Sequence, residues 1–352
     1  MTICGDEALC RPLGSAGSHL HHMPRPADEV VAFPSYELYG AGVNGTEERN
    51  YDWSKITSVA PFEPMGRWKV GDRAFGEVYC EAHRVGAKML AWNQPGWNNT
   101  ACAVSHVYDL WRHADPQMYN ATHIAAWATE TAECLAATGW DGVLFDAEVT
   151  PPDGAKGRAA VTMAVCALKR ALQITIPGAP VYFAVGAGVA SFDFADMSEK
   201  QQCVDMWMIM DYCLCRALAG NLRANADIRV IDGVKQHYTQ FGVPMAHVGV
   251  IFPWFGCDFA CVGGDPACPT VAIAHTTHSE FPADDPSHPG SLSGCGYGEW
   301  DNAGIAEVVE FLAPNNTAPD KGWLLDEPTM TRHFIWRNGS GALHDIWFDD
   351  RE

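Results

Sequence analysis

The stretch that decides the fold is Trp140-Asp141-Gly142-Val143-Leu144-Phe145-Asp146-Ala147-Glu148, which follows a helical segment ending at Gly139. In a strand, alternation sends the side chains of Leu144, Asp146 and Glu148 to one face and those of the residues between them to the other. Two carboxylates at i and i+2 then lie about 7 Å apart along the strand. Burying them is costly, and barrel enzymes keep their active sites at the carboxyl ends of their strands, so this pair is a candidate catalytic site.

The carboxylate pair has two interpretations. Close like charges raise the pKa of one member, so Glu148 can stay protonated beside an ionised Asp146 and act as a general acid. Alternatively, both carboxylates cap the next helix or bind Lys and Arg near the strand end. The spacing alone does not separate these interpretations.

Short apolar runs predict seven strands, at 29–33, 56–62, 87–92, 140–145, 180–187, 204–210 and 247–254. Stretches of helical length and period lie between several of them, at 118–138, 157–174 and 221–241. Strand–helix alternation predicts a parallel sheet. No Gly-x-Gly-x-x-Gly follows the first strand, which disfavours a doubly wound dinucleotide-binding sheet. We therefore expect an α/β fold, a (β/α)8 TIM barrel of which one unit is unaccounted for.

The composition of the sequence changes at Phe255, after which cysteines occur among Gly, Pro and Asp residues. One helix is predicted near 299–312, and a hairpin pairs 333–337 with 343–348 across a Gly-rich turn. The predicted domains are a Cys-containing N-terminal loop at 1–28, a barrel catalytic domain at 29–256 and an α+β insertion subdomain after strand 7 at 257–350.

The charge balance excludes one class of partner. The 352 residues hold 23 Lys and Arg against 43 Asp and Glu, a formal charge of -20, which repels a phosphate backbone. Nucleic acid is therefore not an expected partner. No apolar run approaches the roughly 20 residues of a membrane span, so no membrane association is expected. We also expect the protein to be a monomer.

The cysteines and the glycosylation sequons favour the secretory route. There are 13 Cys, and Asn-x-Ser/Thr sequons begin at Asn44, Asn98, Asn120, Asn315 and Asn338. We expect a lysosomal or extracellular location, although the residues after Met1 show neither the basic nor the apolar region of a signal peptide.

A metal or redox site is a weaker interpretation of the same residues. His19, His21 and His22 lie near Cys4 and Cys10, but no CxxC pair is present. A tethered loop, with a Cys4–Cys10 disulfide as one option, is the preferred interpretation.

Asp-Gly-x-x-x-Asp-x-Glu at 141–148 resembles the signature of glycoside hydrolase family 18, whose usual form is DGxDxDxE. Other segments resemble the lysosomal di-N-acetylchitobiase branch of that family. They are Leu9-Cys10-Arg11-Pro12, Tyr51-Asp52-Trp53-Ser54-Lys55-Ile56-Thr57, Met210-Asp211-Tyr212, Pro253-Trp254-Phe255-Gly256 and His344-Asp345-Ile346-Trp347-Phe348-Asp349. The likeness covers nearly the whole chain.

The resemblance implies a retaining glycosidase that cleaves β-1,4-linked N-acetylglucosamine by substrate-assisted catalysis. Glu148 matches the proton donor, Asp146 the residue that orients the 2-acetamido group, and Tyr212 the tyrosine that hydrogen-bonds its carbonyl oxygen. Asp141 opens the motif on the opposite parity, so we interpret it as structural. The implied substrates are chitobiose, chito-oligomers and the N-glycan core, with neither a cofactor nor a metal ion.

Two tryptophans at strand ends, Trp92 and Trp254, are candidates for stacking on sugar rings. The alternative is that they fill the mouth of the barrel.

Three features depart from the family pattern. Leu144 stands where the family has Asp and the chitobiase branch Asn, so we expect an impaired or shifted pH profile. Cys213 replaces an Asp after Tyr212, and the family's eighth strand is not found before Glu352, which suggests a fragment. The rival hypotheses are a catalytically inactive chito-oligosaccharide-binding lectin on the same barrel and, from another class, a redox or metal protein.

Overall fold

A computed structural model of the chain describes the placement of residues 4, 7–13, 28–33, 52–61, 73–93, 102, 104, 110, 113, 115–146, 153–186, 202–211, 233, 236, 238–240, 242–251, 255–260, 298–301, 324–327, 330–337 and 343–348. Contacts divide the chain into two compact units. The first comprises Met1–Val185, Ala190–Met208 and Tyr238–Gly249, and the second comprises Gly186–Val189, Ile209–His237 and Val250–Glu352. Each unit is described by itself below.

Seven strands form one sheet in chain order, β1-β2-β3-β4-β5-β6-β7, and the pairs from β1 to β5 are parallel. They are β1 (Val31–Ala32), β2 (Ser58–Val59), β3 (Lys88–Asn93), β4 (Gly142–Asp146), β5 (Val181–Gly186), β6 (Met206–Met210) and β7 (Val248–Ile251). Each lies within, or within one residue of, a run predicted from the sequence. The prediction of seven strands in a parallel sheet is therefore confirmed.

Three long helices accompany these strands: α2 (Arg73–Val85), α4 (Ala121–Thr138) and α5 (Ala155–Thr175). The predicted helix at 118–138 is confirmed: a short 3-10 turn, Pro116–Tyr119, is followed by α4. The predicted helix at 157–174 is confirmed as α5. Helix α2 was not predicted. Most of 221–241 lies outside the described residues.

Local chemistry fixes both ends of α4. Asn120 is the N-cap, and its side-chain oxygen accepts hydrogen bonds from the N–H groups of Thr122 and His123, at 3.0 and 3.2 Å. Gly139 ends the helix in the left-handed conformation at φ 87°. Three residues, Gly139 to Asp141, therefore separate α4 from β4.

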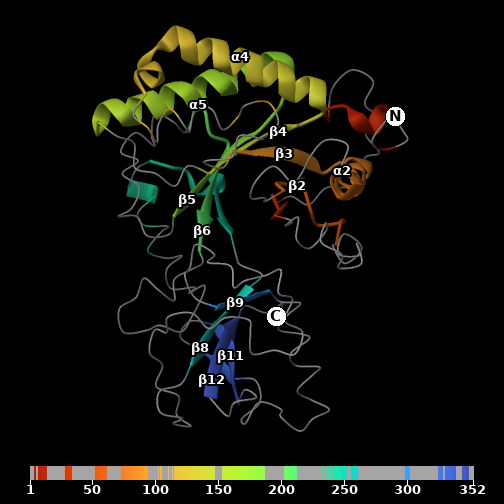
Figure 1. Ribbon diagram of the computed structural model, residues 1–352, viewed down its shortest axis with the longest axis vertical. Helices are drawn as coiled ribbons and strands as arrows, with labels where there is room; N and C mark the ends of the chain where they lie inside the picture. The colour runs from red at the N-terminus through yellow and green to blue at the C-terminus, as the bar shows by residue number, and fades with distance from the viewer. Residues whose placement is uncertain are drawn as a thin grey trace. The chain divides into compact units, whose positions relative to one another are not determined.

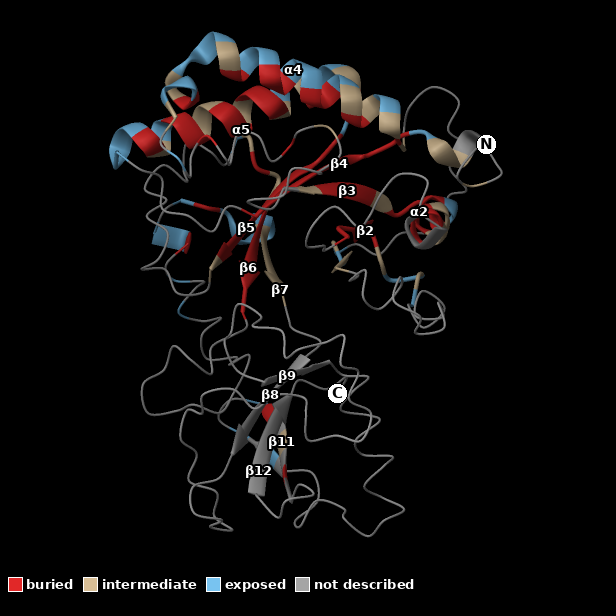
Figure 2. Cartoon of the chain, viewed as in Figure 1, coloured by how far each residue is buried: buried red, intermediate tan, exposed pale blue. Residues whose placement is uncertain are grey.

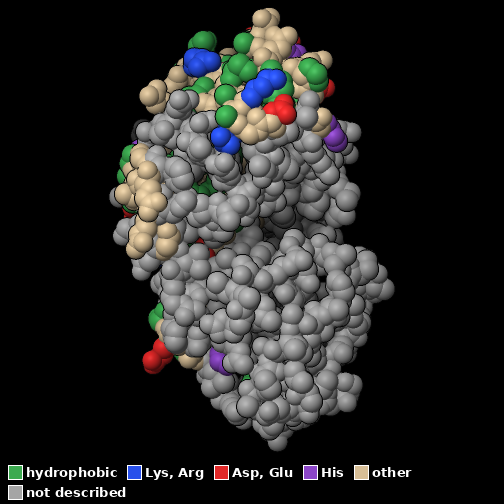
Figure 3. Space-filling model, turned by 90° about the vertical axis from the view of Figure 1, so that its left-hand side faces the viewer, with side chains coloured by type: hydrophobic (Ala, Val, Ile, Leu, Met, Phe, Trp, Pro, Cys, Tyr) green, Lys and Arg blue, Asp and Glu red, His purple; other side chains and the backbone are tan. Residues whose placement is uncertain are grey.

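Aromatic rings form the centre of the core on one face of the sheet. The rings of Phe145 and Phe183 lie 5.9 Å apart, and those of Phe183 and Trp207 lie 5.4 Å apart; all three side chains are buried. In Figure 1, α4 and α5 run side by side, and Figure 2 shows that each has one buried and one exposed side. On the face in Figure 3, their described surface mixes apolar, basic and acidic side chains, which is typical of a solvated helix face.

A polar side chain stands directly before each even-numbered strand of the sheet. Asp141, before β4, donates its N–H to the Met89 carbonyl at 2.9 Å and accepts the Met89 N–H with its carboxylate at 2.6 Å. Asp205, before β6, makes the same two contacts with Val181, at 2.8 and 2.7 Å. Thr57, before β2, makes them with Val30, at 2.9 and 2.8 Å. We call these three residues the edge clamps, because they satisfy backbone donors at the amino-terminal edge of the sheet.

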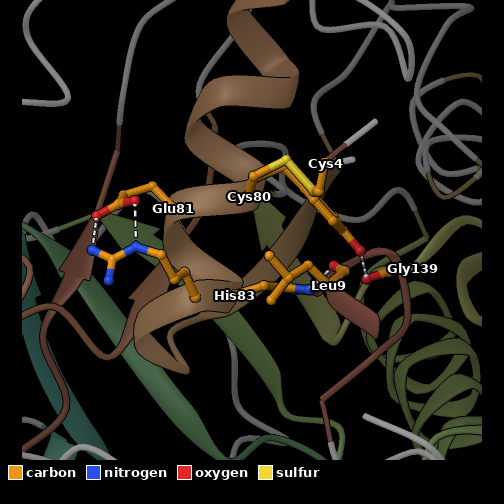
Figure 4. The surroundings of a disulfide bond; sticks show 8 residues. Cys4, Leu9, Cys80, Glu81, His83 and Gly139 are labelled. Atoms are coloured by element: carbon orange, nitrogen blue, oxygen red, sulfur yellow. Dashed lines mark hydrogen bonds and ion pairs between the residues drawn. A yellow bond between two sulfur atoms is a disulfide. The ribbon is translucent and has the colours of Figure 1, made fainter. Parts of the chain in front are cut away.

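Three disulfides lie within the described residues: Cys4–Cys80, Cys102–Cys134 and Cys166–Cys203. The Cys4–Cys10 option was wrong, because Cys4 bonds Cys80 on α2, and Cys10 is present as a thiol. Figure 4 shows this disulfide joining the N-terminal segment to the helix. The cross-link holds Leu9 and Leu13 near the edge clamps.

The second unit contains an antiparallel sheet of order β10-β11-β12-β8-β9. Its strands are β8 (Phe255–Ala260), β9 (Gly298–Asp301), β10 (Leu324–Asp326), β11 (Thr331–Arg337) and β12 (Leu343–Phe348). The predicted hairpin is confirmed, since Arg337 pairs with Leu343 and His333 with Trp347. The predicted helix near 299–312 is wrong at 299–301, where β9 pairs with β8; 302–312 lies outside the described residues.

None of the helices in the described part of the chain combines the length and the apolar character that a membrane span requires.

Candidate active site

The approach to β4 explains where the motif begins. Gly139 lies so close to α2 that a Cβ on it would come within 2.1 Å of the Tyr79 hydroxyl oxygen, and that hydroxyl donates to the Gly139 carbonyl at 2.7 Å. Only glycine combines this close approach with a positive φ. Burial is the main cause that raises the pKa of Tyr79 well above its ordinary value, and the charge of Asp141 adds to it. Tyr79 therefore stays a neutral donor and fixes the entry to β4.

Asp141 lies at the amino-terminal edge of the sheet and is buried. Besides the Met89 N–H, its carboxylate accepts the Leu13 N–H at 2.5 Å and faces His83 Nε2 at 2.9 Å. His83 Nδ1 faces the Leu9 carbonyl at 2.7 Å, a contact shown in Figure 4. Asp141 is thus the centre of a buried hydrogen-bond network that ties the N-terminal segment to the sheet.

Asp146 lies at the opposite, carboxyl end of β4. It is 3% exposed and pairs with Ala184 of β5. Residues that pair in a parallel sheet point to the same face, and Phe145 faces the aromatic core, so Asp146 and Leu144 point to the other face. In a closing barrel that other face is the interior, and we call it the inner face.

Three large side chains form one layer of the inner face directly before Asp146. Trp92 pairs with Leu144, and Leu144 pairs with Tyr182. Leu144 is completely buried, and Trp92 contacts the ring of Phe33 edge-on at 5.6 Å between centroids. The side chain that departs from the family pattern, Leu144, therefore gives Asp146 an apolar neighbour on its own strand.

A polar cluster on the inner face was missed by the sequence analysis. Ser58 donates to the Glu29 carboxylate, and Tyr182 lies near enough for the charge of Glu29 to help raise its pKa, after burial, which is the main cause. Glu29 and Ser58 fall inside predicted strands, and strand parity places them with the inner-face residues. Strand parity could have indicated that these residues share a face. It could not have shown that residues 29, 58 and 182 lie near one another, because that depends on the register of the strands.

Of the predicted site residues, the structure describes Asp146, Trp92 and Asp141. It places Asp146 and Trp92 on the inner face and Asp141 at the amino-terminal edge, as strand parity requires. Glu148, Tyr212 and Trp254 lie outside the described residues, so their roles stay predictions. The described residues include no group of three or more His, Cys, Asp or Glu side chains able to hold a metal ion.

No protein-family model matches the chain. Two curated relatives match it along nearly its whole length. Di-N-acetylchitobiase of Rattus norvegicus is 20% identical over 99% of this chain and 79% of the relative, and probable di-N-acetylchitobiase 1 of Dictyostelium discoideum is 23% identical over 99% and 81%. The chain is a divergent relative of the di-N-acetylchitobiases. The predicted resemblance to this branch is confirmed, and with it the assignment to the glycoside hydrolases.

A solved structure supports the fold of this chitobiase relative. The glycoside hydrolase family 18 N-acetylglucosaminidase of Paenibacillus barengoltzii superposes with a TM-score of 0.58 at 15% identity, over 92% of this chain and 88% of the other. The predicted barrel fold is confirmed by this likeness together with the seven strands in chain order.

Proposed function

We propose that this chain is a retaining glycosidase that hydrolyses β-1,4-linked N-acetylglucosamine in chitobiose, chito-oligosaccharides and the N-glycan core. The observation that carries the proposal is Asp146, a carboxylate buried at the inner carboxyl end of β4, in a chain with Glu148 two residues later and di-N-acetylchitobiases as relatives. A buried carboxylate at this end of a barrel strand is where barrel enzymes perform chemistry.

The proposed reaction uses the substrate's own acetamido group as nucleophile. Glu148 protonates the glycosidic oxygen while the acetamido carbonyl oxygen attacks the anomeric carbon from the other side, and the leaving sugar departs. The Asp146 carboxylate holds the acetamido N–H and stabilises the positive charge of the resulting oxazolinium ion. Glu148, now ionised, deprotonates the water that opens the ring, and the second inversion restores the original configuration.

Tyr212 is proposed to donate its hydroxyl to the attacking carbonyl oxygen, and Trp92 and Trp254 to stack on sugar rings. The sugar supplies the nucleophile and the protein supplies the acid, so the scheme uses neither a metal ion nor an organic cofactor.

We also propose a lysosomal or extracellular location. Disulfides persist in oxidising compartments, and three of them lie within the described residues. The five sequons point the same way.

The test is incubation of the purified chain with N,N′-diacetylchitobiose and chito-oligomers between pH 4 and 7, with Glu148→Gln as the matched variant. Released N-acetylglucosamine is quantified by chromatography, and NMR identifies the anomer formed first. We expect β-anomer release by the parent and a loss of at least about 100-fold in the variant, because general-acid catalysis contributes that much. Sugar binding without release by a folded parent would contradict the proposal and favour the lectin.

A further inference from the structure

The sequon Asn120-Ala121-Thr122 lies within the described part of the chain, at the start of α4. Asn120 is the N-cap of α4, and its side-chain Oδ1 accepts the N–H groups of Thr122 and His123 at 3.0 and 3.2 Å. Both partners are donors, so they fix which atom of the amide is the oxygen, and Nδ2 makes neither contact. The cap therefore uses one atom of the amide and leaves the nitrogen to a second role.

Capping by itself does not require a nitrogen at this position. Asp115 caps the preceding 3-10 turn, Pro116–Tyr119, and its carboxylate accepts the Gln117 N–H at 2.8 Å. Asn and Asp are about equally good N-cap residues. The amide nitrogen of Asn120 is therefore a chemical group that the cap does not use.

The sequon is open to solvent along its whole length. Asn120, Ala121 and Thr122 are all exposed, and so are Pro116 and Gln117 in the preceding turn. A sugar chain is bulky and hydrophilic, so it is accommodated only where it stays in water. A glycan on Asn120 meets this requirement without displacing a side chain of the core.

The backbone around the sequon is held in place by side chains. The Tyr119 hydroxyl donates to the carboxylate of Asp153, before α5, at 2.6 Å, and the Lys156 ammonium lies 3.7 Å from the centre of the Tyr119 ring. The residue directly before the sequon is thus fixed to the neighbouring helix. A glycan on Asn120 has a defined starting point on the surface.

The direction of α4 places this starting point relative to the sheet. Helix α4 leads from β3 to β4, and these two strands are parallel neighbours. A helix that joins parallel strands runs back along them, so α4 begins on the side of their carboxyl ends. The helices of a barrel cover its outside, whereas Asp146 points to the inner face. A glycan on Asn120 therefore stands outside the barrel wall and leaves the inner face open.

We propose that Asn120 is an N-glycosylation site, whose glycan and helix cap share one amide group. The inference rests on the secretory location proposed above. In the transfer, Nδ2 attacks C1 of the N-acetylglucosamine at the end of a polyprenyl-pyrophosphate-linked oligosaccharide. The Nδ2–C1 bond forms, the bond from C1 to the pyrophosphate oxygen breaks, the pyrophosphate leaves, and Nδ2 loses one proton. The product is still an amide, so Oδ1 continues to cap α4, and Thr122 supplies the hydroxyl that the sequon requires.

The experiment expresses the full chain in a eukaryotic secretory host and digests it with trypsin after reduction of the disulfides. The tryptic peptide 113–156 contains Asn120 as its single Asn, so a label on it has one possible position. A peptide N-glycosidase in heavy-oxygen water converts a glycosylated Asn into labelled Asp, which mass spectrometry detects. We expect a labelled peptide from the parent and from Thr122→Ser, which keeps the sequon, and complete loss of the label in Thr122→Ala.

Two substitutions of Asn120 separate the glycan from the cap. Asn120→Asp and Asn120→Ala both lose one glycan, which a denaturing gel shows as one step of faster migration, but the Asp keeps the capping oxygen. After the same glycosidase treatment of all samples, we expect Asn120→Asp to melt with the parent and Asn120→Ala to melt at a lower temperature. Equal melting of Asn120→Asp and Asn120→Ala, below the parent, would overturn the sharing of one amide.

Chitobiose hydrolysis is measured on the same preparations, so the two proposals fail separately. A secreted, active parent whose peptide 113–156 carries no label overturns the glycosylation of Asn120 and leaves the proposed activity intact. A folded parent with the label that releases no sugar supports the glycosylation and overturns the activity.

Discussion

The two ends of β4 carry one buried aspartate each, and the two are used differently. Asp141, at the amino-terminal edge, is 3% exposed and accepts hydrogen bonds from the backbone of Leu13 and Met89 as well as pairing with His83. Asp146, at the carboxyl end, is equally buried but follows the apolar Leu144 on the inner face. The donors around the Asp141 carboxylate stabilise the fold, whereas the position of Asp146 is the one at which barrel enzymes place their active sites, and we propose that role for it.

The side-chain contacts at the amino-terminal edge of the sheet repeat from strand to strand, whereas the side chains of the inner face differ. Thr57, Asp141 and Asp205 make the same pair of contacts with the preceding strand. On the inner face, by contrast, β3, β4 and β5 place Trp92, Leu144 and Tyr182 in one layer. Similar side-chain contacts are expected where side chains satisfy backbone groups. Different side chains are expected on a face where a ligand is proposed to bind.

The largest expected effect separates the two aspartates. Asp141→Ala leaves two backbone N–H groups and the Nε2 of His83 buried without their shared partner, so we expect a loss of about 3–5 kcal/mol in the free energy of unfolding. For Asp146→Asn we expect stability within about 1 kcal/mol of the parent and a kcat lower by about 100-fold, because the proposed mechanism loses the charge that stabilises its intermediate. Urea unfolding followed by tryptophan fluorescence measures the first, and chitobiose hydrolysis the second.

The control for this comparison is His83→Gln combined with Asp141→Asn. The double variant keeps an amide at each position that can hydrogen-bond the backbone and the other side chain, so it should be more stable than Asp141→Ala. Equal stability losses at Asp141 and Asp146, with activity retained in both, would contradict the division of roles along β4.

A graded series sharpens the same contrast at the other two edge clamps. Asp205→Ala removes the acceptor of the Val181 N–H and the partner of Lys169, and we expect a loss of about 2 kcal/mol, reduced because the Asp205 side chain is 41% exposed. Thr57→Val keeps the shape and removes the acceptor of the Val30 N–H, for about 1 kcal/mol. Unfolding curves that reversed the order Asp141, Asp205, Thr57 would contradict this ranking, which follows the number of partners that each substitution removes.

Much of the fold could be predicted from the sequence because the signal is local. Strands such as β4 and β5 are buried on both faces and therefore read as continuous apolar runs. Helix α2 was missed because its buried face includes the polar His83, which is stabilised by Asp141, 58 residues later in the chain. Strand β9 was mistaken for a helix because its structure depends on pairing with β8.

For the candidate site, too, local features could be predicted from the sequence and contacts between distant residues could not. Strand parity alone separates Asp146 from Asp141, since that requires only the alternation within one strand. It does not join Glu29 to Ser58, because their contact links the segment before β1 to β2 and depends on how the strands align. Contacts between residues distant in sequence were therefore the part that required a structure.

The smallest expected effect concerns a carboxylate–donor contact made in water. The Tyr119 hydroxyl donates to Asp153 at 2.6 Å, and this hydrogen bond is the main cause that raises the pKa of Tyr119 to about 12. Because the folded-state pKa is raised above the unfolded value of about 10, the stabilisation is complete below pH 10 and is lost as the pH rises through 12.

Asp153→Asn removes the carboxylate, so the pKa of Tyr119 should fall toward 10. Phenolate absorbance at 295 nm measures it, with Tyr119→Phe subtracted as the blank. Lys156, whose ammonium lies 3.7 Å from the centre of the ring, is present in the parent and in Asp153→Asn and does not account for a difference between them. An unchanged titration would mean that water replaces this exposed contact completely. We expect Asp153→Asn to lower the pKa of Tyr119 and to leave the melting temperature of the protein at pH 7 unchanged. Asp141→Ala, by contrast, should lower the stability strongly, because a hydrogen bond to a carboxylate stabilises the fold strongly only where water is excluded.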